Sequence, residues 1–309
     1  MRTARPARLL AVIAAPALAL GLVAAPAASP AGAATRHYRE YVALGDSFSA
    51  DVFTTLPPVT SGVPIGCAQS RTDYPHQVAK ALKVQTFRDA TCGSATTEHM
   101  TKPQSVPLGN PNPPQFKRLT KRTDLVTLGI GGNDIGLVGI AESCLSLLPT
   151  RSATSGCKAT YTAGGVDKVT KAIAATAKKI TKVVKGIRAR SPKARIVLVN
   201  YLDAVPLDGS ACWGLVAPIT KTDMTWFAKK YQQMNAMIAT VATRTHASLA
   251  DTFTPTIGHD VCKGPGTRYV EGLVPLSVSN PLLLAFPFHP NQAGANAQAK
   301  AVIARIKRS

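Results

Sequence analysis

Five short apolar segments, separated by stretches with helical periodicity, constrain the fold of this chain more than any other feature. The segments are residues 41–45, 84–87, 124–128, 195–199 and 247–250. Helical patterns occupy residues 74–82, 166–190 and 292–306. Short buried strands that alternate with helices are typical of a parallel sheet covered on both faces. We therefore predict an α/β fold with three layers (α/β/α), built on a five-stranded parallel sheet.

The first 34 residues predict a secretory signal peptide. Arginines at positions 2, 5 and 8 precede an apolar run from residue 9 to about residue 25, and small residues follow at 31–34. Pro16 interrupts the run, which is shorter than the ~20 apolar residues that a membrane span needs, so an anchor is disfavoured. We expect cleavage after Ala33 or Ala34, which leaves residues 35–309 as a single secreted domain.

Six cysteines follow the leader, at positions 67, 92, 144, 157, 212 and 262. In an exported chain, an even number of cysteines indicates disulfides before it indicates a metal site. The sequence contains no CxxC pair and no HExxH motif. We therefore expect disulfides and neither a metal nor an organic cofactor.

The chain is strongly basic, with a formal net charge of +20, of which +17 remains once the three arginines of the leader are removed. Seven of the basic residues lie on one face of the predicted helix 166–190, at positions 168, 171, 178, 179, 182, 185 and 188. A solvated outer face is the simpler interpretation, and a face that binds an anionic surface is the alternative. No aromatic residues interleave with these lysines, so nucleic acid is not an expected partner.

Four short polar motifs stand at the ends of predicted elements. They are Gly45-Asp46-Ser47 after the first strand, Cys92-Gly93-Ser94-Ala95 after the second, Gly131-Gly132-Asn133-Asp134 after the third, and His289-Pro290-Asn291 before the last helix. The carboxyl ends of parallel strands meet in the crevice where such folds bind ligands. A serine hydroxyl there becomes a nucleophile only with a base in hydrogen-bond reach. Alone, each motif is weak evidence: the alternative for Gly45-Asp46-Ser47 is a helix N-cap, and the alternative for Gly93 and Asn133 is a plain turn.

Together and in this order, the four motifs resemble the SGNH (GDSL) hydrolase family over essentially the whole mature chain. The resemblance implies a flavodoxin-like strand order and the hydrolysis of carboxylic esters through an acyl-serine intermediate. It implies Ser47 as nucleophile and His289 as general base. The implied oxyanion hole consists of the backbone amides of Ser47 and Gly93 and the side-chain amide of Asn133. Similarity to secreted members also implies the disulfides Cys67–Cys92, Cys144–Cys157 and Cys212–Cys262.

The acidic member of a catalytic triad is missing from its usual place. Many members of the family have Asp three residues before the catalytic histidine, whereas this chain has Phe286 three residues before His289. By analogy with some secreted members, the backbone carbonyl of Phe286 is expected to accept the imidazole Nδ1–H, which makes the site a Ser-His dyad. Asp251 and Asp260 remain alternative acids. His259, one residue before Asp260, is the rival base.

The substrate is inferred from apolar residues near the motifs. Residues 273–288 are rich in leucine, valine and phenylalanine, and Ile135, Leu137, Val138 and Ile140 follow the third motif. Such a lining suits an acyl or lipid ester, although the same residues would also suit a local core. Phospholipase A-type activity and carbohydrate acetyl esterase activity are the alternatives among enzymes. A non-catalytic, secreted module that binds polyanions is the alternative from another class. We expect a monomer.

Overall fold

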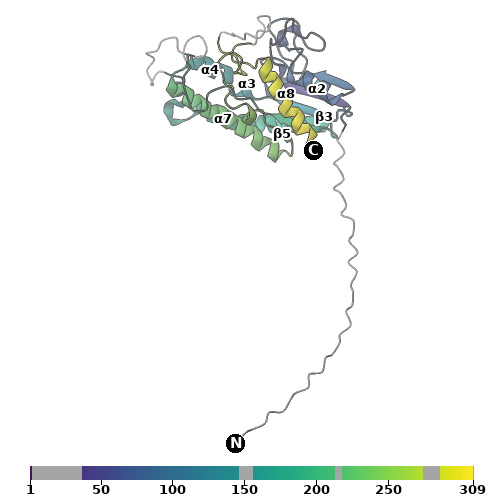
Figure 1. Cartoon of the computed structure of the whole chain (residues 1–309). Helices are drawn as coiled ribbons and strands as arrows, with labels where there is room; N and C mark the ends of the chain where they lie inside the picture. Colours follow the sequence, from purple (N-terminus) through teal and green to yellow (C-terminus); the bar gives the residue numbers. More distant parts are fainter. Residues whose placement is uncertain (2–36, 146–155, 213–217, 274–285, 309) are drawn as a thin grey trace. The chain divides into compact units, whose positions relative to one another are not determined.

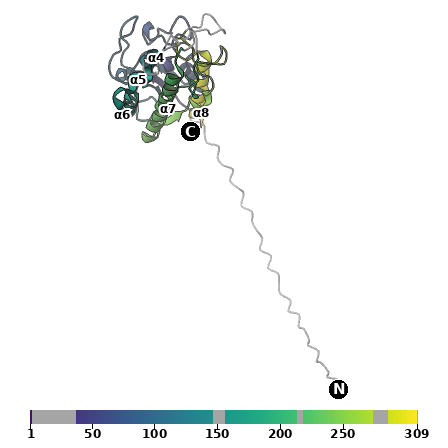
Figure 2. The same cartoon turned by 90° about the vertical axis from the view of Figure 1, so that its left-hand side faces the viewer.

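The computed structural model describes Met1 and residues 37–145, 156–212, 218–273 and 286–308. The predicted leader, apart from Met1, lies outside the described residues. Figure 1 and Figure 2 show strands and helices that alternate along the chain. Among the described helices, none has both the length and the hydropathy that a membrane-spanning segment requires.

A five-stranded sheet lies at the centre of the domain, with all neighbouring strands parallel. The strands are β1 (Glu40–Gly45), β2 (Thr86–Asp89), β3 (Leu125–Gly129), β4 (Arg195–Val199) and β5 (Ser248–Ala250). Their order is β2-β1-β3-β4-β5. The register pairs Gly45 with Gly129, so β1 and β3 end at the same edge. The predicted fold class, strand number and strand order are confirmed.

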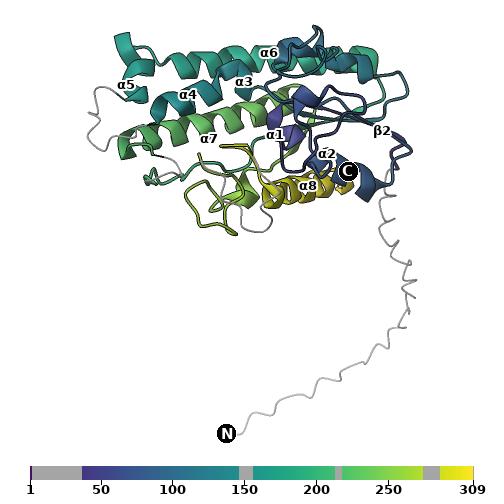
Figure 3. The ribbon, with the colours of Figure 1, turned by 90° about the horizontal axis from the view of Figure 1, so that it is seen from above.

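Helices cover both faces of the sheet. The longer ones are α2 (Tyr74–Leu82), α4 (Leu137–Cys144), α6 (Lys168–Arg190), α7 (Lys221–Arg244) and α8 (Gln292–Lys307). Figure 3 shows α6 and α7 side by side, and α2 beside α8 on the other side of the sheet. Along β1, Val42 and Leu44 belong to the core that includes α6 and α7, whereas Tyr41 and Ala43 belong to the core beneath α2 and α8. This period-two alternation divides the apolar residues between two cores.

Short helical turns occupy several of the connections. They are α1 (Ser47–Ala50), η1 (Ile65–Cys67), η2 (Thr97–Met100), η3 (Gln115–Arg118), α3 (Gly132–Ile135), α5 (Cys157–Thr162), η4 (Ala163–Gly165) and η5 (Thr254–Thr256). Disulfides join Cys67 to Cys92, Cys144 to Cys157 and Cys212 to Cys262. These are the pairs that the family resemblance implies. The first holds the loop before α2 against the segment that follows β2.

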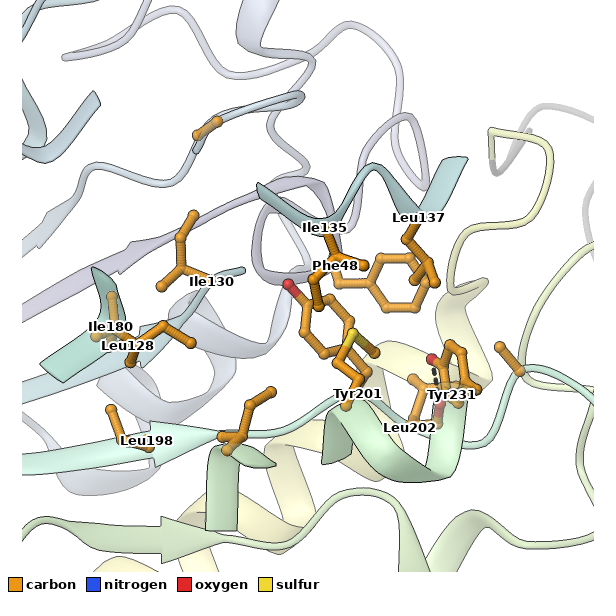
Figure 4. Close-up of a cluster of buried hydrophobic side chains, with 14 of the residues drawn as sticks. Phe48, Leu128, Ile130, Ile135, Leu137, Ile180, Leu198, Tyr201, Leu202 and Tyr231 are labelled. Atoms are coloured by element: carbon orange, nitrogen blue, oxygen red, sulfur yellow. Dashed lines mark hydrogen bonds between the residues drawn. The ribbon is translucent and has the colours of Figure 1, made fainter. Parts of the chain in front are cut away.

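The larger core lies beneath the short helix α1. Figure 4 shows Phe48 of α1 beside Ile135, Leu137 and Tyr201. The rings of Phe48 and Tyr201 meet edge to face, with their centroids 5.2 Å apart. Because Phe48 is buried in this core, the short helix that carries the adjacent Ser47 is anchored by close packing rather than by its own length.

Candidate active site

The position of Ser47 follows from the end of β1 and from the cap of α1. Asp46 is the N-cap of α1, and its carboxylate accepts a hydrogen bond from the backbone N–H of Phe48 at 3.0 Å. Ser47 is therefore the first residue of the helix. Its side chain lies at the carboxyl edge of the sheet, where ligands bind in open parallel sheets.

Glycine at position 45 is required by the close approach of β1 and β3. A Cβ atom there would lie 2.3 Å from Ser49 Oγ and 2.7 Å from the carbonyl oxygen of Gly129. Both distances are shorter than any real Cβ contact. Ser49 uses this space to donate a hydrogen bond to the Gly129 carbonyl at 3.2 Å. The first glycine of the motif thus allows β1 to pass into the nucleophile turn beside β3.

The structure brings the predicted base to the predicted nucleophile. His289 Nε2 lies 2.8 Å from Ser47 Oγ, and both residues are buried, with exposed fractions of 4% and 7%. His289 Nδ1 lies 2.8 Å from the carbonyl oxygen of Pro287. A carbonyl can only accept a hydrogen bond, so Nδ1 carries the proton and Nε2 faces the serine hydroxyl as an acceptor.

The structure corrects the expectation that the Phe286 carbonyl accepts the imidazole Nδ1–H of His289. The Phe286 carbonyl accepts the backbone N–H of His289 at 3.0 Å and does not contact the imidazole ring. This bond closes a tight turn, in which Phe288 has a left-handed backbone (φ 59°). Within the turn, the next carbonyl along the chain, that of Pro287, reaches Nδ1 instead.

The alternative acids and the rival base have other partners. Asp251 accepts hydrogen bonds from Asn200 and from the backbone N–H groups of residues 253 and 254. Asp260 accepts the backbone N–H of residue 262 and lies 3.6 Å from Lys263. His259 stacks on Tyr269 and contacts the carbonyl of residue 267. Among the described residues, no carboxylate lies within hydrogen-bond distance of His289.

Burial keeps the imidazole neutral. Removal of water lowers the pKa of His289 to about 4, and the Pro287 carbonyl opposes this by favouring the protonated ring. The ring is therefore uncharged at neutral pH and available to accept a proton from Ser47. Once the imidazolium forms, the dipole of the Pro287 carbonyl stabilises it through the contact with Nδ1.

The structure also corrects the expectation that the backbone N–H of Gly93 is an oxyanion donor. Its backbone N–H is already donated to the carbonyl of Cys67 at 2.9 Å. The N–H of the next residue, Ser94, has no acceptor among the described residues, and Ser94 has a left-handed backbone (φ 62°) and lines the cavity above Ser47. The amide available at this turn is therefore that of Ser94. Glycine suits position 93 because a Cβ would lie only 3.2 Å from the Cys67 carbonyl.

The other two oxyanion candidates face the same cavity. Ser47 is the first helical residue of α1, so its backbone N–H has no partner within the helix. Asn133, in α3, donates one amide hydrogen to the carbonyl of Ala95 at 2.9 Å and lines the cavity with Ser47. That bond fixes the amide plane and leaves the second hydrogen of Nδ2 for a ligand.

Comparison with known proteins shows the family of the chain. Residues 43–297 match the model of the GDSL-like lipase/acylhydrolase family. Lipase 2 of Streptomyces coelicolor is 32% identical over 263 residues, which are 84% of this chain and 83% of that protein. The chain belongs to the GDSL-like lipase/acylhydrolase family. It is a carboxylic ester hydrolase.

Solved structures show the same fold at lower identity. A phospholipase A1 from Streptomyces albidoflavus superposes with a TM-score of 0.67 at 22% identity, covering 87% of this chain and 99% of that one. An extracellular lipase from Streptomyces rimosus superposes with a TM-score of 0.64, also at 22% identity and with the same coverage. The fold that the chain shares with these structures therefore extends over most of its length.

Two structural carboxylates of the GDSL-like site connect its motifs. Asp46 accepts a hydrogen bond from the Tyr201 hydroxyl, which in turn accepts the backbone N–H of Gly132 at 2.7 Å. Burial raises the pKa of Asp46 to about 7. Asp134 accepts the backbone N–H and the hydroxyl of Thr97 at 2.8 and 2.6 Å. Sequence reasoning missed Tyr201, because none of the four motifs includes it.

A buried ion pair supports the histidine turn of this GDSL-like enzyme. Arg268 and Glu271 lie 2.6 Å apart and are almost fully buried. The backbone N–H of Glu271 donates to the His289 carbonyl at 3.0 Å, and its carboxylate accepts Asn291 Nδ2 at 2.8 Å. Sequence reasoning missed this pair. The signal available was weak, namely two opposite charges three residues apart beside an apolar stretch.

The cavity above Ser47 is mostly apolar and has a volume of about 400 Å³. Apolar side chains at its mouth are unusually exposed: Leu108 (62%), Phe286 (47%), Val138 (40%) and Ile65 (36%). Most of the apolar lining comes from residues 52–68 and 107–108, rather than from the segments named in the sequence. Ile135, Leu137 and Ile140 pack in the core instead. Residues 274–285 of the other expected segment lie outside the described residues.

A second, basic groove of about 870 Å³ adjoins the GDSL-like site at Asn133. It lies between η2 and α6 and is lined by Lys102, Lys179, Lys182, Lys185 and Arg190. Two of these lysines are paired, Lys102 with Glu98 at 2.6 Å and Lys179 with Asp134 at 3.1 Å. Lys182, Lys185 and Arg190 are exposed and form no ion pair among the described residues, so the groove has a net positive charge.

Proposed function

We propose that the protein is a secreted esterase of the lipase type, which uses Ser47 and His289 as a catalytic dyad on acyl esters. The observation that carries the proposal is the 2.8 Å contact between His289 Nε2 and Ser47 Oγ at the floor of an apolar cavity. Secretion is supported by the leader-like residues 1–34, by the disulfides, and by the extracellular relative from Streptomyces rimosus.

The chemistry follows from the placement of each group. Ser47 Oγ attacks the ester carbonyl while His289 Nε2 accepts its proton. Negative charge then develops on the carbonyl oxygen, where the N–H groups of Ser47, Ser94 and Asn133 converge; one such donor contributes about 3 kcal/mol. The imidazolium returns its proton to the departing alkoxide, which leaves an acyl-Ser47 ester. Water, deprotonated by the same imidazole, hydrolyses that ester and restores Ser47.

The dyad depends on orientation in place of a carboxylate. In a triad, the acid holds the imidazole in the correct tautomer and stabilises the imidazolium. Here the Pro287 carbonyl performs the first task through its contact with Nδ1. It performs the second less well, because a dipole stabilises a cation less than a full negative charge does. The proposed enzyme therefore has a Ser-His dyad in which the histidine is well oriented and weakly basic.

The acyl chain is the part of the substrate that the cavity suits best. Its lining is apolar apart from the catalytic groups, and each CH₂ that leaves water contributes about 0.8 kcal/mol. Exposed apolar residues at the mouth extend this surface outward. We expect kcat/KM to increase with acyl length over p-nitrophenyl esters until the cavity is filled.

Ser47→Ala tests the proposal. Hydrolysis of p-nitrophenyl esters should fall by more than about 10⁴-fold, because the acyl-enzyme can no longer form. A serine-directed phosphonate should add one adduct to the wild type and none to this variant. Ser61→Ala, at an exposed serine of the loop between α1 and α2, is the matched control and should retain activity. Activity of Ser47→Ala within tenfold of the wild type, with unchanged thermal unfolding, would eliminate Ser47 as nucleophile.

A phospholipase A-type activity is a second candidate, favoured by the basic groove beside Asn133. Its position would allow a phosphate headgroup to lie on α6 while the ester reaches Ser47. The named relative from Streptomyces albidoflavus is a phospholipase A1. Lys182→Glu/Lys185→Glu should lower hydrolysis of anionic phospholipid vesicles at least tenfold and leave p-nitrophenyl ester hydrolysis unchanged. Lys171→Glu, on the same helix but outside the groove, is the control. Equal effects of both variants would remove this candidate.

A further inference from the structure

Three titratable side chains meet at a place that is separate from the lining of the cavity above Ser47. Asp73 is the N-cap of α2, His76 lies in the first turn of that helix, and Asp89 ends β2. One ligand-type atom from each residue lies within 4.8 Å of the other two. Asp73 Oδ1 is 2.7 Å from His76 Nδ1, and Asp89 Oδ2 is 3.7 Å from the same nitrogen. No residue of this cluster belongs to the catalytic site.

Carboxylate oxygens in the cluster are buried without hydrogen-bond partners. Among the described residues, neither Asp73 Oδ2 nor Asp89 Oδ2 has one, although both atoms are inaccessible to solvent. The Oδ2 atom of Asp89 is the one that faces His76 Nδ1, beyond hydrogen-bond distance. A buried polar atom without a partner costs free energy, and a charged one costs more. The cluster therefore has ligand atoms directed at a site that the described side chains do not fill.

The charge of the region is also unbalanced. A third acid, Asp51, is the C-cap of α1 and is fully buried, and its Oδ2 accepts the backbone N–H of Tyr74 at 2.9 Å. Among the described residues, no lysine or arginine forms an ion pair with any of the three acids. Burial raises the pKa of all three carboxyls well above the usual range, and the charge of Asp73 raises those of Asp51 and Asp89 further.

We propose that Asp73, His76 and Asp89 bind one divalent cation of the zinc class. Two carboxylates and one imidazole neutralise a doubly charged ion and supply the mixed oxygen and nitrogen donors that zinc accepts, whereas calcium and magnesium prefer oxygen alone. Water completes the coordination. His76 Nδ1 changes from hydrogen-bond donor to ligand when the cation binds. The site has no compact sequence motif, because Asp73 and His76 lie at the start of α2 whereas Asp89 lies at the end of β2.

A route to the site exists. An opening of about 240 Å³ is lined by His76 and Asp89, and the His76 side chain is about a third exposed. Arg88 and Arg118 also line this opening. Arg88 is paired with Glu40 at 2.9 Å and Arg118 donates to the carbonyl of Gly62, so both guanidinium groups are engaged away from the cluster.

The expected role of the cation is structural. It would join the start of α2 to the end of β2, and Asp51 connects that junction to α1, the helix that begins at Ser47. Such a bond stabilises the folded state alone, because the three ligands are brought together only by folding. The competing explanation is a proton shared between Asp73 and Asp89, which would neutralise one carboxylate without any metal.

The test uses the purified, EDTA-treated enzyme and ZnCl₂ as the probe, with CaCl₂ and MgCl₂ for comparison. Calorimetry should show one high-affinity Zn²⁺ per chain, and saturation should raise Tm by about 3 °C or more. EDTA should reverse the shift. His76→Gln and Asp89→Asn should each weaken Zn²⁺ binding by at least tenfold. His246→Gln, at an exposed histidine outside the cluster, is the matched control and should bind like the wild type.

Two results would overturn the proposal. One is the absence of Zn²⁺ binding below about 1 mM, together with an Asp89→Asn variant that is more stable than the wild type; this pair of findings would identify the shared proton. The other is Zn²⁺ binding that His76→Gln and Asp89→Asn leave unchanged, which would place the ion elsewhere on the protein. Because His76 is partly exposed, its variant is expected to fold, so the test does not depend on replacing a buried acid.

Discussion

At the scale of single residues, His289, the proposed general base, combines burial with an uncharged hydrogen-bond partner. His289 contacts Ser47 through one ring nitrogen and a backbone carbonyl through the other. The two groups nearest to the ring therefore fix its orientation without adding charge. This arrangement has consequences for two measurements, the effect of removing distant acids and the pH dependence of the reaction.

Replacing the distant acids should have little effect on catalysis. Asp251→Asn and Asp260→Asn should each keep kcat within about tenfold of the wild type, because both carboxylates bond to their own loops. A carboxylate-to-amide change in a true triad costs about 10⁴ in kcat. Steady-state kinetics on a p-nitrophenyl ester measures this, with circular dichroism as the control for folding. A loss above about 10³ in either variant would establish a relocated triad acid.

The pH profile should report the low pKa of His289. Because burial lowers that pKa to about 4, the ring becomes charged, and unable to accept a proton, only as the pH falls through about 4. We expect kcat/KM to be level from about pH 5 to pH 8 and to fall below that range. An inflection near 6.5 would contradict this. An inflection near 7 that disappears in Asp46→Asn would instead report Asp46, whose pKa is raised to about 7 by burial.

At the scale of elements, the turn that carries His289 is hydrogen-bonded to a buried ion pair, Arg268–Glu271. The turn containing His289 is joined through backbone hydrogen bonds to Glu271, and α8 begins immediately after it, capped by Asn291. Asn291 also donates to the Arg268 carbonyl and to the Glu271 carboxylate. The ion pair, the cap and the catalytic turn are therefore one connected unit.

Breaking this pair should destabilise the protein and displace the base. Glu271→Gln keeps an oxygen for Asn291 but leaves the Arg268 charge buried and unpaired, which costs about 3–5 kcal/mol. Urea unfolding should show this loss, and kcat should fall. Lys102→Met, which breaks an exposed pair with Glu98, is the control and should leave the urea midpoint nearly unchanged, because solvent screens an exposed ion pair. A Glu271→Gln enzyme as stable as the wild type would show that Arg268 is compensated by other groups.

At the scale of the whole molecule, three disulfides connect the loops around the sheet. The bonded cysteines are 13, 25 and 50 residues apart in the sequence. A crosslink restricts the unfolded chain more when it closes a longer loop. Several long loops of this fold line the cavity or precede His289. Because the crosslinks reduce the conformational entropy of the unfolded chain, these loops lose less entropy on folding.

Removal of the disulfides should follow their loop lengths. Paired cysteine-to-alanine variants should lose about 3 kcal/mol for Cys144–Cys157 and about 4 kcal/mol for Cys212–Cys262 on the loop-entropy model. Denaturant unfolding of the two double variants, each compared with the oxidised wild type, measures the ranking. The reverse order would mean that native contacts near Cys144, rather than the unfolded chain, determine the effect.

Sequence patterns predicted the elements with strong local signals. The bounds of α2 and β4 agree with the prediction, and α8 differs by one residue. The strand expected at 84–87 is β2 at Thr86–Asp89, two residues later. The prediction did not name α7, although its apolar residues recur at helical spacing and Thr220 caps it by accepting the N–H of Asp223. Its mixed polar surface made that stripe less obvious than that of α6.

Local sequence determined the strand and helix pattern and the cap of the turn that carries Ser47, because periodicity and capping residues depend on near neighbours in the chain. Motif order named Ser47 and His289 as the candidate nucleophile and base. The tertiary structure decided which atoms face the reaction. It placed the Pro287 carbonyl rather than that of Phe286 on the imidazole, and the amide of Ser94 rather than that of Gly93 in the cavity. The carbonyl and amide groups of two neighbouring residues in a turn point in different directions. That direction depends on turns and on contacts with distant segments, which sequence spacing does not specify.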